Sequence, residues 1–148
     1  MEKVVIIGCS GTGALAGLTL KKLAPQLEVT IIREPEEKGL LTRCATPYIC
    51  CGDVLINPSY KDDNIFLQQK IKLIDSQATE INRSQKTVKT AAGEIFPYDK
   101  LVLATGAQPA IPSLPGIHLK GIFTLRTSAD AFNILYWLNN QRVKKALL

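Results

Sequence analysis

Three short runs of aliphatic and β-branched residues, widely separated along the chain, predict buried strands. They are residues 3–7, 29–32 and 101–103, and each is largely apolar without alternation, which is typical of parallel strands that are covered on both faces. Residues 14–24 lie between the first two runs and predict a helix that Pro25 ends. The order of strand, helix and strand indicates a right-handed βαβ unit.

Leucines at helical spacing indicate the buried face of the helix over 14–24. We expect Leu15, Leu18 and Leu23 to contribute to that face. A second, short helix is predicted to begin near Pro47, because proline is favoured in the first turn of a helix.

Further helical and extended segments are predicted along the rest of the chain. Residues 63–69 predict one or two helical turns, and residues 122–125 are strand-like. Ser128 is a suitable N-cap for a helix over 129–139, because its hydroxyl can accept a hydrogen bond from a free N–H of the first turn.

Four short extended segments lie close together and predict an antiparallel meander. They are residues 71–74, 77–81, 87–90 and 95–98. Turn residues, including Ala92-Gly93, separate them. We therefore expect a meander over about residues 71–98 that is inserted into the parallel fold.

Composition and charge exclude several classes of protein. The chain has 148 residues, of which 46% are hydrophobic, as expected for a globular domain with a core. It contains no apolar run near the ~20 residues of a membrane helix, and the first strand begins too early for a signal peptide, so we expect a cytoplasmic protein without membrane contact. The net charge is +5, but the basic residues are scattered and predict no nucleic-acid partner. With His118 as the single histidine, we expect no metal site.

The segment Gly8–Gly13 has the composition of a phosphate-binding turn. It joins the first strand to the following helix, so its backbone can approach a pyrophosphate while the helix N-terminus supplies free N–H groups. Ser10 replaces the middle glycine of the usual G-x-G-x-x-G pattern, but it is small, and the adjacent Gly11 can provide the close approach. The residues expected to bind a dinucleotide here are Gly8, Ser10, Gly11, Thr12 and Gly13.

Glu34 follows the second predicted strand, where an acid binds the adenosine ribose in dinucleotide-binding folds. A carboxylate at this position accepts hydrogen bonds from the ribose hydroxyls. The alternative is that Glu34 belongs to an exposed acidic loop with Glu36 and Glu37. Its position directly after the strand favours the ribose role.

The segment 98–106, Tyr-Asp-Lys-Leu-Val-Leu-Ala-Thr-Gly, is considerably more specific than the glycine turn alone. It resembles the second flavin-domain motif of the pyridine nucleotide–disulfide oxidoreductases. The resemblance implies that Thr105 and Gly106 pass close to a bound FAD, where Gly106 permits a tight turn. Ala78, in the strand over 77–81, is also predicted to be a cofactor-binding residue.

The segment 44–48, Cys-Ala-Thr-Pro-Tyr, resembles the Cys-Gly-Leu-Pro-Tyr segment of the single-cysteine branch of this family. Coenzyme A-disulfide reductases, NADH oxidases and NADH peroxidases belong to this branch. The resemblance implies that Cys44 is the catalytic thiol. Arg43 and the helix expected after Cys44 would both favour the thiolate, and Arg43 is included among the cofactor-binding residues. The family has glycine where this chain has Cys51, and this departure bears on the substrate.

The remaining cysteines, Cys9, Cys50 and Cys51, are expected to be inert. Five residues separate Cys44 from Cys50, whereas the two-cysteine reductases have four residues between the members of their redox pair. An internal redox disulfide of that type is therefore not expected.

The resemblance covers nearly the whole chain and implies its fold and domain organisation. The fold would be α/β, a Rossmann-like FAD/NAD(P)-binding three-layer fold with a parallel sheet and the inserted antiparallel meander. Residues 1–142 would form the N-terminal part of an FAD-binding domain, and residues 143–148 would begin a truncated NADH-binding domain with a buried strand. We therefore expect the 148-residue chain to be inactive by itself.

The resemblance also implies the function of a longer parent protein. It would be an NAD(P)H-dependent flavoprotein that binds FAD and takes electrons from NADH or NADPH. Its acceptor would be a small molecule, namely a disulfide, a persulfide, a peroxide or oxygen, reduced through the flavin and the single cysteine. The parent protein is expected to be a homodimer.

Two alternatives remain open at this point. The first is a flavoprotein reductase of a protein electron carrier of the rubredoxin or ferredoxin type, in which Cys44 is inert. The second is a non-catalytic nucleotide-binding module.

Overall fold

Two compact units make up the chain. The computed structural model describes residues 1–35, 43–53, 62–141 and 143–147. The first unit consists of residues 1–41 and 60–106, and the second of residues 42–59 and 107–148. Each helix in the described ranges is too short or too polar to cross a membrane.

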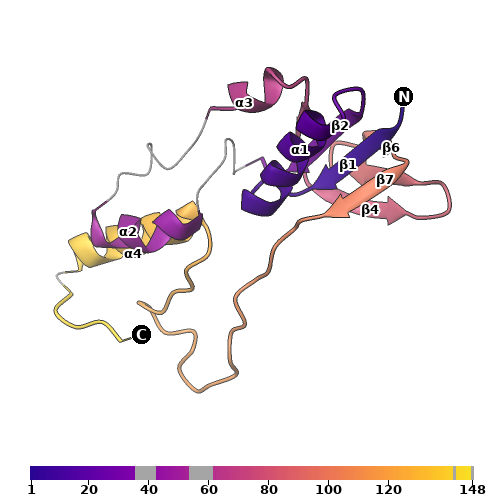
Figure 1. Ribbon diagram of the computed structural model, residues 1–148. Helices are drawn as coiled ribbons and strands as arrows, with labels where there is room; N and C mark the ends of the chain where they lie inside the picture. Colours follow the sequence, from indigo (N-terminus) through magenta and orange to yellow (C-terminus); the bar gives the residue numbers. More distant parts are fainter. Residues whose placement is uncertain (36–42, 54–61, 142, 148) are drawn as a thin grey trace. The chain divides into compact units, whose positions relative to one another are not determined.

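A four-stranded parallel sheet forms the centre of the first unit (Figure 1). In spatial order its strands are β3 (Lys72–Asp75), β2 (Glu28–Arg33), β1 (Lys3–Ile7) and β7 (Lys100–Leu103). Ile6 at the centre of the sheet pairs with Ile31 of β2 and Val102 of β7. The three strands predicted from apolar runs are therefore confirmed, and they are direct neighbours.

The antiparallel meander is shorter than the sequence predicts. It consists of β4 (Ala78–Asn82), β5 (Thr87–Thr90) and β6 (Ile95–Pro97), paired in that order. The strand over residues 72–75 pairs in parallel with β2 instead. Its two apolar side chains suit either sheet, but pairing with the edge of β2 satisfies the backbone of β3 and adds Ile74 to the core between the two sheets.

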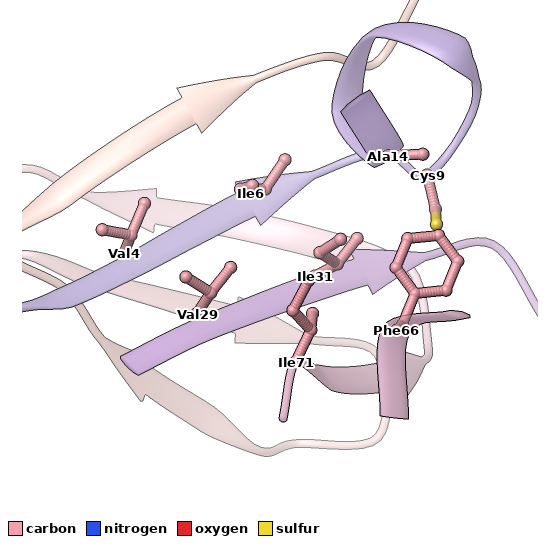
Figure 2. Close-up of a cluster of buried hydrophobic side chains, with 8 residues drawn as sticks. All are labelled: Val4, Ile6, Cys9, Ala14, Val29, Ile31, Phe66 and Ile71. Atoms are coloured by element: carbon pink, nitrogen blue, oxygen red, sulfur yellow. The ribbon is translucent and has the colours of Figure 1, made fainter. Parts of the chain in front are cut away.

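Two hydrophobic clusters on opposite faces of the parallel sheet produce three layers. On one face, α1 (Gly11–Leu23) and the short α3 (Asn64–Leu67) cover the sheet. Figure 2 shows the buried members of this cluster, which are Val4, Ile6, Cys9, Ala14, Val29, Ile31, Phe66 and Ile71. On the other face, Val88 and Phe96 of the meander pack against alternate residues of the same strands, Val5 and Ile7 among them. The predicted three-layer α/β fold is thus confirmed, as are the helical turns within 63–69.

The buried face of α1 differs from the prediction. The helix begins at Gly11 rather than Ala14, and Leu15 and Leu23 are 66% and 77% exposed. The face that meets the sheet consists of Gly13, Ala14, Gly17 and Lys21. A Cβ at Gly17 would lie 2.9 Å from Cδ1 of Ile31, so the helix approaches too closely to bury leucines there. Of the three predicted leucines, Leu18 is half-buried and packs against the core, as expected. Small residues determine how closely α1 approaches the sheet.

The second unit is built around two helices. A 3-10 turn, η1 (Arg43–Ala45), leads into α2 (Thr46–Cys51), which packs against α4 (Ser128–Asn140). The helix predicted near Pro47 is confirmed. The N-cap of α4 is Thr127 and not Ser128, because the Thr127 side chain accepts from the N–H of Asp130 while the Asp130 carboxylate accepts from the N–H of Thr127. This reciprocal pair is a capping box.

Two predicted extended segments of the second unit are wrong. Residues 122–125 form no strand, and the Phe123 ring packs edge-on against Trp137 of α4 with 5.8 Å between centroids. The apolar pattern of this segment is therefore explained in part by packing against α4 and not by membership of a sheet. Residues 143–147 have no regular structure and are exposed, although the sequence predicts a buried strand there. That they open a second domain stays a prediction.

Candidate dinucleotide-binding site

The carboxyl ends of three parallel strands bring the predicted cofactor-binding segments to one edge of the sheet. β1 runs into Gly8–Gly13, β7 runs into Ala104–Gly106, and Glu34 follows β2. From β1 the chain passes through α1 to β2 on one side, while β7 lies on the other side. The edge between β1 and β7 is therefore a topological switch point, the place where open α/β sheets bind ligands.

Gly8 is held where no other residue fits. Its φ is +103°, and a Cβ there would lie 2.2 Å from the carbonyl oxygen of Ala104. The Gly8 N–H donates to the carbonyl of Ile32 at 2.8 Å, and the Ala104 N–H donates to the carbonyl of Ile7 at the same distance. The turn after β1 is thus fixed between the ends of β2 and β7.

Gly13 and Gly11 have opposite surroundings within the same turn. A Cβ at Gly13 would lie 2.0 Å from the carbonyl oxygen of Gly8, whereas a Cβ at Gly11 would meet no atom within 4 Å. Gly11 and Thr12 are exposed in the first turn of the 13-residue α1, whose first N–H groups have no carbonyl partner within the helix. The turn therefore has an open side lined by helix N–H groups.

The middle position of the motif does not obstruct this arrangement. Ser10 is the N-cap of α1, its backbone is extended, and its side chain makes no capping hydrogen bond. The two contacts that require glycine fall on Gly8 and Gly13, not on Ser10. The residues present consequently fit a pyrophosphate, with the dipole of α1 favouring its negative charge.

The other predicted cofactor-binding residues of the first unit lie after β2, after β7 and at the start of β4. Glu34 is exposed directly after β2, while Glu36 and Glu37 lie outside the described residues. Thr105 is exposed after β7, and Gly106 has a φ of +74°. Ala78 begins β4, three residues after the end of β3, and is half-buried against the cluster between the two sheets.

Sequence reasoning missed an ion-pair cluster around the buried Arg33 at the same edge. Arg33, the last residue of β2, donates from Nη1 and Nη2 to the two carboxylate oxygens of Asp63 at 2.7 and 2.6 Å. Its Nε donates to Asp75 at 2.6 Å. The hydrogen bonds to Asp63 are the main cause that raises the pKa of Arg33, against the opposing effect of burial. The available signal was an arginine and an aspartate that both end neighbouring strands.

Cys9 is the one cysteine of the dinucleotide turn. It is buried against Phe66 (Figure 2). Burial raises the pKa of the Cys9 thiol, although the nearby positive charge of Arg33 opposes the shift. This protonated, enclosed thiol agrees with the expectation that Cys9 is inert.

Cys44 lies in the second unit and is exposed in η1, two residues before α2. The neighbouring Arg43 donates from Nη1 to the carbonyl of Arg126 at 2.9 Å. Cys50 is half-buried, and burial, followed by the proximity of Cys51, raises its pKa. The structure thus brings the predicted phosphate and ribose residues together in the first unit, whereas Arg43 and Cys44 belong to the second.

All four cysteines are free thiols. Within the described ranges, no group of three or more histidine, cysteine, aspartate or glutamate side chains could hold a metal ion.

Known proteins are similar to this chain over nearly its whole length. The family model described as pyridine nucleotide-disulphide oxidoreductase matches residues 2–144. The NAD(P)H coenzyme A polysulfide/persulfide reductase of Pyrococcus horikoshii is 30% identical over 99% of this chain and 34% of its own length. The NADH oxidase of Methanocaldococcus jannaschii is 31% identical over 97% of the chain and likewise 34% of its own length. The chain therefore spans about a third of the length of these relatives.

Solved structures share the fold. The NAD-dependent persulfide reductase from A. fulgidus has a TM-score of 0.81 and 29% identity, covering 93% of this chain and 28% of that one. The NADH:rubredoxin oxidoreductase from Clostridium acetobutylicum has a TM-score of 0.78 and 27% identity, covering 94% of this chain and 36% of that one. Both similarities extend over nearly all of the present chain.

Proposed function

The chain belongs to the pyridine nucleotide-disulphide oxidoreductase family, and from this membership we propose that it is the FAD-binding part of an NAD(P)H-dependent flavoprotein oxidoreductase. One observation carries the proposal. The phosphate-binding turn packs at Gly8 against the backbone of Ala104 and is hydrogen-bonded to Ile32 near the end of β2. Relatives over this length are called an NAD(P)H persulfide reductase and an NADH oxidase.

Each part of the edge has a role in binding the cofactor. The open side of the turn at Gly11 and Thr12 offers helix N–H groups to the pyrophosphate. Glu34 accepts hydrogen bonds from the ribose. Thr105 and Gly106 line the next part of the dinucleotide, with Ala78 and Arg43 proposed as further contacts. When bound, FAD supplies two-electron exchange between NADH or NADPH and the acceptor.

We further propose that Cys44 is the redox-active thiol of the complete protein. Its exposure supports this role, because a thiol that meets a small disulfide, persulfide or peroxide must be accessible. The name of the Pyrococcus horikoshii relative, which includes persulfide reductase, points to the same class of acceptor. The acceptor is thus a small molecule, and the complete protein is proposed to be a cytoplasmic homodimer.

A second candidate function is the reduction of a protein electron carrier. The similarity to NADH:rubredoxin oxidoreductase, at 27% identity, supports it. In this case Cys44 would be inert.

The absorption spectrum of the purified complete protein tests the proposed function. A flavoprotein oxidoreductase is yellow as purified, and anaerobic NADH or NADPH bleaches the flavin absorption. Colourless protein that stays colourless after incubation with FAD would contradict cofactor binding. A flavin that neither nucleotide bleaches would favour a non-catalytic binding module.

A further inference from the structure

Arg33 joins three elements at the edge where the dinucleotide is proposed to bind. It ends β2 and pairs in register with Asp75, which ends β3. Asp63 is the residue that precedes α3. The three hydrogen bonds from Arg33 therefore connect the ends of two strands to the beginning of a helix.

The neighbours of Arg33 in the chain are connected to the proposed cofactor site. Ile32 accepts the hydrogen bond from the N–H of Gly8 in the phosphate-binding turn. Glu34, the residue proposed to bind ribose, follows Arg33 directly. A restraint on the backbone at Arg33 consequently acts on both.

Stability alone is a weak reason for a charge at this position. The Arg33 side chain is only 2% exposed, whereas its partners Asp63 and Asp75 are 32% and 38% exposed, and the removal of the guanidinium from water is costly even when it is paired. Packed apolar side chains often stabilise a core as well as a buried ion pair does. Unlike an apolar side chain, the planar guanidinium fixes the directions of several hydrogen bonds at once, and so it can hold its partners in a defined orientation.

We propose that Arg33 is a positioning residue of the dinucleotide site, and this inference rests on the proposed function. Through Asp63 and Asp75, Arg33 fixes the end of β2, so that the Glu34 carboxylate already lies where the ribose binds. A site that is ordered before the ligand arrives loses less conformational freedom on binding and so binds more tightly.

The affinity of the complete protein for FAD tests this role. We would titrate apoprotein with FAD and follow the quenching of flavin fluorescence. Arg33→Met should weaken binding about tenfold, which corresponds to ~1.4 kcal/mol. Arg33→Lys keeps the charge but not the fork, and should fall between the wild type and Arg33→Met.

Lys21 provides a matched control. It is also a buried cation of the first unit, and its Nζ donates to the carbonyls of Pro25 and Leu27 at 2.6 and 2.9 Å. These residues precede β2, at the end opposite to Glu34. Lys21→Met should lower the melting temperature yet leave the dissociation constant for FAD unchanged. If Lys21→Met and Arg33→Met weaken FAD binding equally, the effect is general destabilisation and the proposal is wrong.

A double-mutant cycle shows whether Arg33 acts through Glu34. Once Glu34→Ala has removed the carboxylate, adding Arg33→Met should weaken FAD binding little further, because positioned groups that act as a unit are not additive. If each substitution raises the dissociation constant for FAD by its own factor and the two factors multiply in the double variant, Arg33 does not act through Glu34 and the positioning role is wrong.

The same cycle separates this proposal from the proposed function. If Glu34→Ala binds FAD as tightly as the wild type, the assignment of the ribose site itself fails. If Glu34→Ala weakens binding while Arg33→Met does not, the role of Arg33 alone fails. Should Arg33→Met not fold, Asp75→Asn, which weakens one of the three hydrogen bonds, should weaken FAD binding in the same direction, and unchanged affinity in that variant contradicts the proposal.

Discussion

At the scale of single residues, the glycines of the dinucleotide turn have two different roles, one in the fold and one in ligand binding. Gly8 and Gly13 are required by the backbone atoms beside them, whereas Gly11 borders open space. The first two maintain the fold, and the third leaves room for a ligand. Substitutions can therefore separate folding from cofactor binding within one motif.

We predict that Gly11→Ala and Gly13→Ala have opposite consequences in the complete protein. Gly11→Ala should leave the melting temperature nearly unchanged, since its methyl group meets no atom, but should weaken FAD binding by crowding the pyrophosphate. Gly13→Ala should destabilise the protein by about 2 kcal/mol or more, since its methyl group overlaps the Gly8 carbonyl. Thermal unfolding and FAD titration of both variants check this, and equal effects on both quantities would contradict it.

We predict that Cys44→Ser keeps FAD and keeps flavin reduction by NADH but loses reduction of sulfur acceptors. A serine hydroxyl does not replace a thiolate as a nucleophile toward a disulfide or persulfide. Cys51→Ser is the control, because Cys51 is also exposed and lies in the adjacent helix. Stopped-flow bleaching and acceptor turnover measure the two steps. Wild-type turnover in Cys44→Ser would favour the protein-carrier alternative.

The sequence predicts candidate residues for the site but not the ion pairs beside them. Gly8–Gly13 and Glu34 were recognisable because a phosphate turn and a ribose acid occupy set places after strands. Arg33 was not, because its partners Asp63 and Asp75 lie 30 and 42 residues away. Their pairing depends on the order of strands in the sheet, which no local pattern contains.

At the scale of elements, α4 shows how closely a cap depends on neighbouring residues. Ser128 and Thr127 are both good N-cap residues, but only Thr127 has an acid at the third helical position, Asp130. The reciprocal bonds of the capping box decide between them. The sequence predicted the helix correctly and placed its cap one residue late.

We predict that Thr127→Ala destabilises the protein by about 1 kcal/mol. It removes the side-chain acceptor for the N–H of Asp130. Ser128→Ala should destabilise the protein less than Thr127→Ala does, because the N-cap acceptor is the Thr127 side chain. Urea denaturation followed by circular dichroism measures both variants, and a larger loss in Ser128→Ala would show that the cap is misplaced.

We predict a contribution to stability from Asp130 that disappears in acid. Burial by itself raises the pKa of Asp130, but the hydrogen bonds from Thr127 and Arg126 outweigh it and lower the pKa below 3.8 overall. Because the folded-state pKa is the lower one, the contribution is complete above pH 3.8 and is lost as the pH falls through the folded-state value. The difference in stability between wild type and Asp130→Asn should therefore shrink below this pH, and a difference independent of pH would contradict the prediction.

The errors at this scale have a common cause. Residues 72–75 joined the parallel sheet, residues 122–125 formed no strand, and α1 left Leu15 and Leu23 exposed while it buried small residues. In each case the local pattern was compatible with several partners, and the tertiary contacts decided. The predictions held where both faces of an element were apolar, as in β1, whose pattern fits only the centre of a sheet.

At the scale of the whole molecule, the three layers and the carboxyl edge followed from the sequence, but the division into units did not. The sequence predicted one domain over 1–142, which stays a prediction, while the described structure forms two compact units that interleave along the chain. The second unit combines 42–59 with 107–148. The contact between α2 and α4 is therefore long-range, and periodicity within either segment does not reveal it.

The central claim is that FAD binds at the edge formed by the Gly8–Gly13 turn and the end of β2. Hydrogen exchange of the complete protein, measured by mass spectrometry with and without FAD, tests it most directly, because bound phosphates slow the exchange of the amides that contact them. We predict strong protection by FAD in peptides that cover residues 8–14, weaker protection after β2, and no change in the meander turn around Gly93. Exchange at residues 8–14 that is the same with and without saturating FAD would contradict the account.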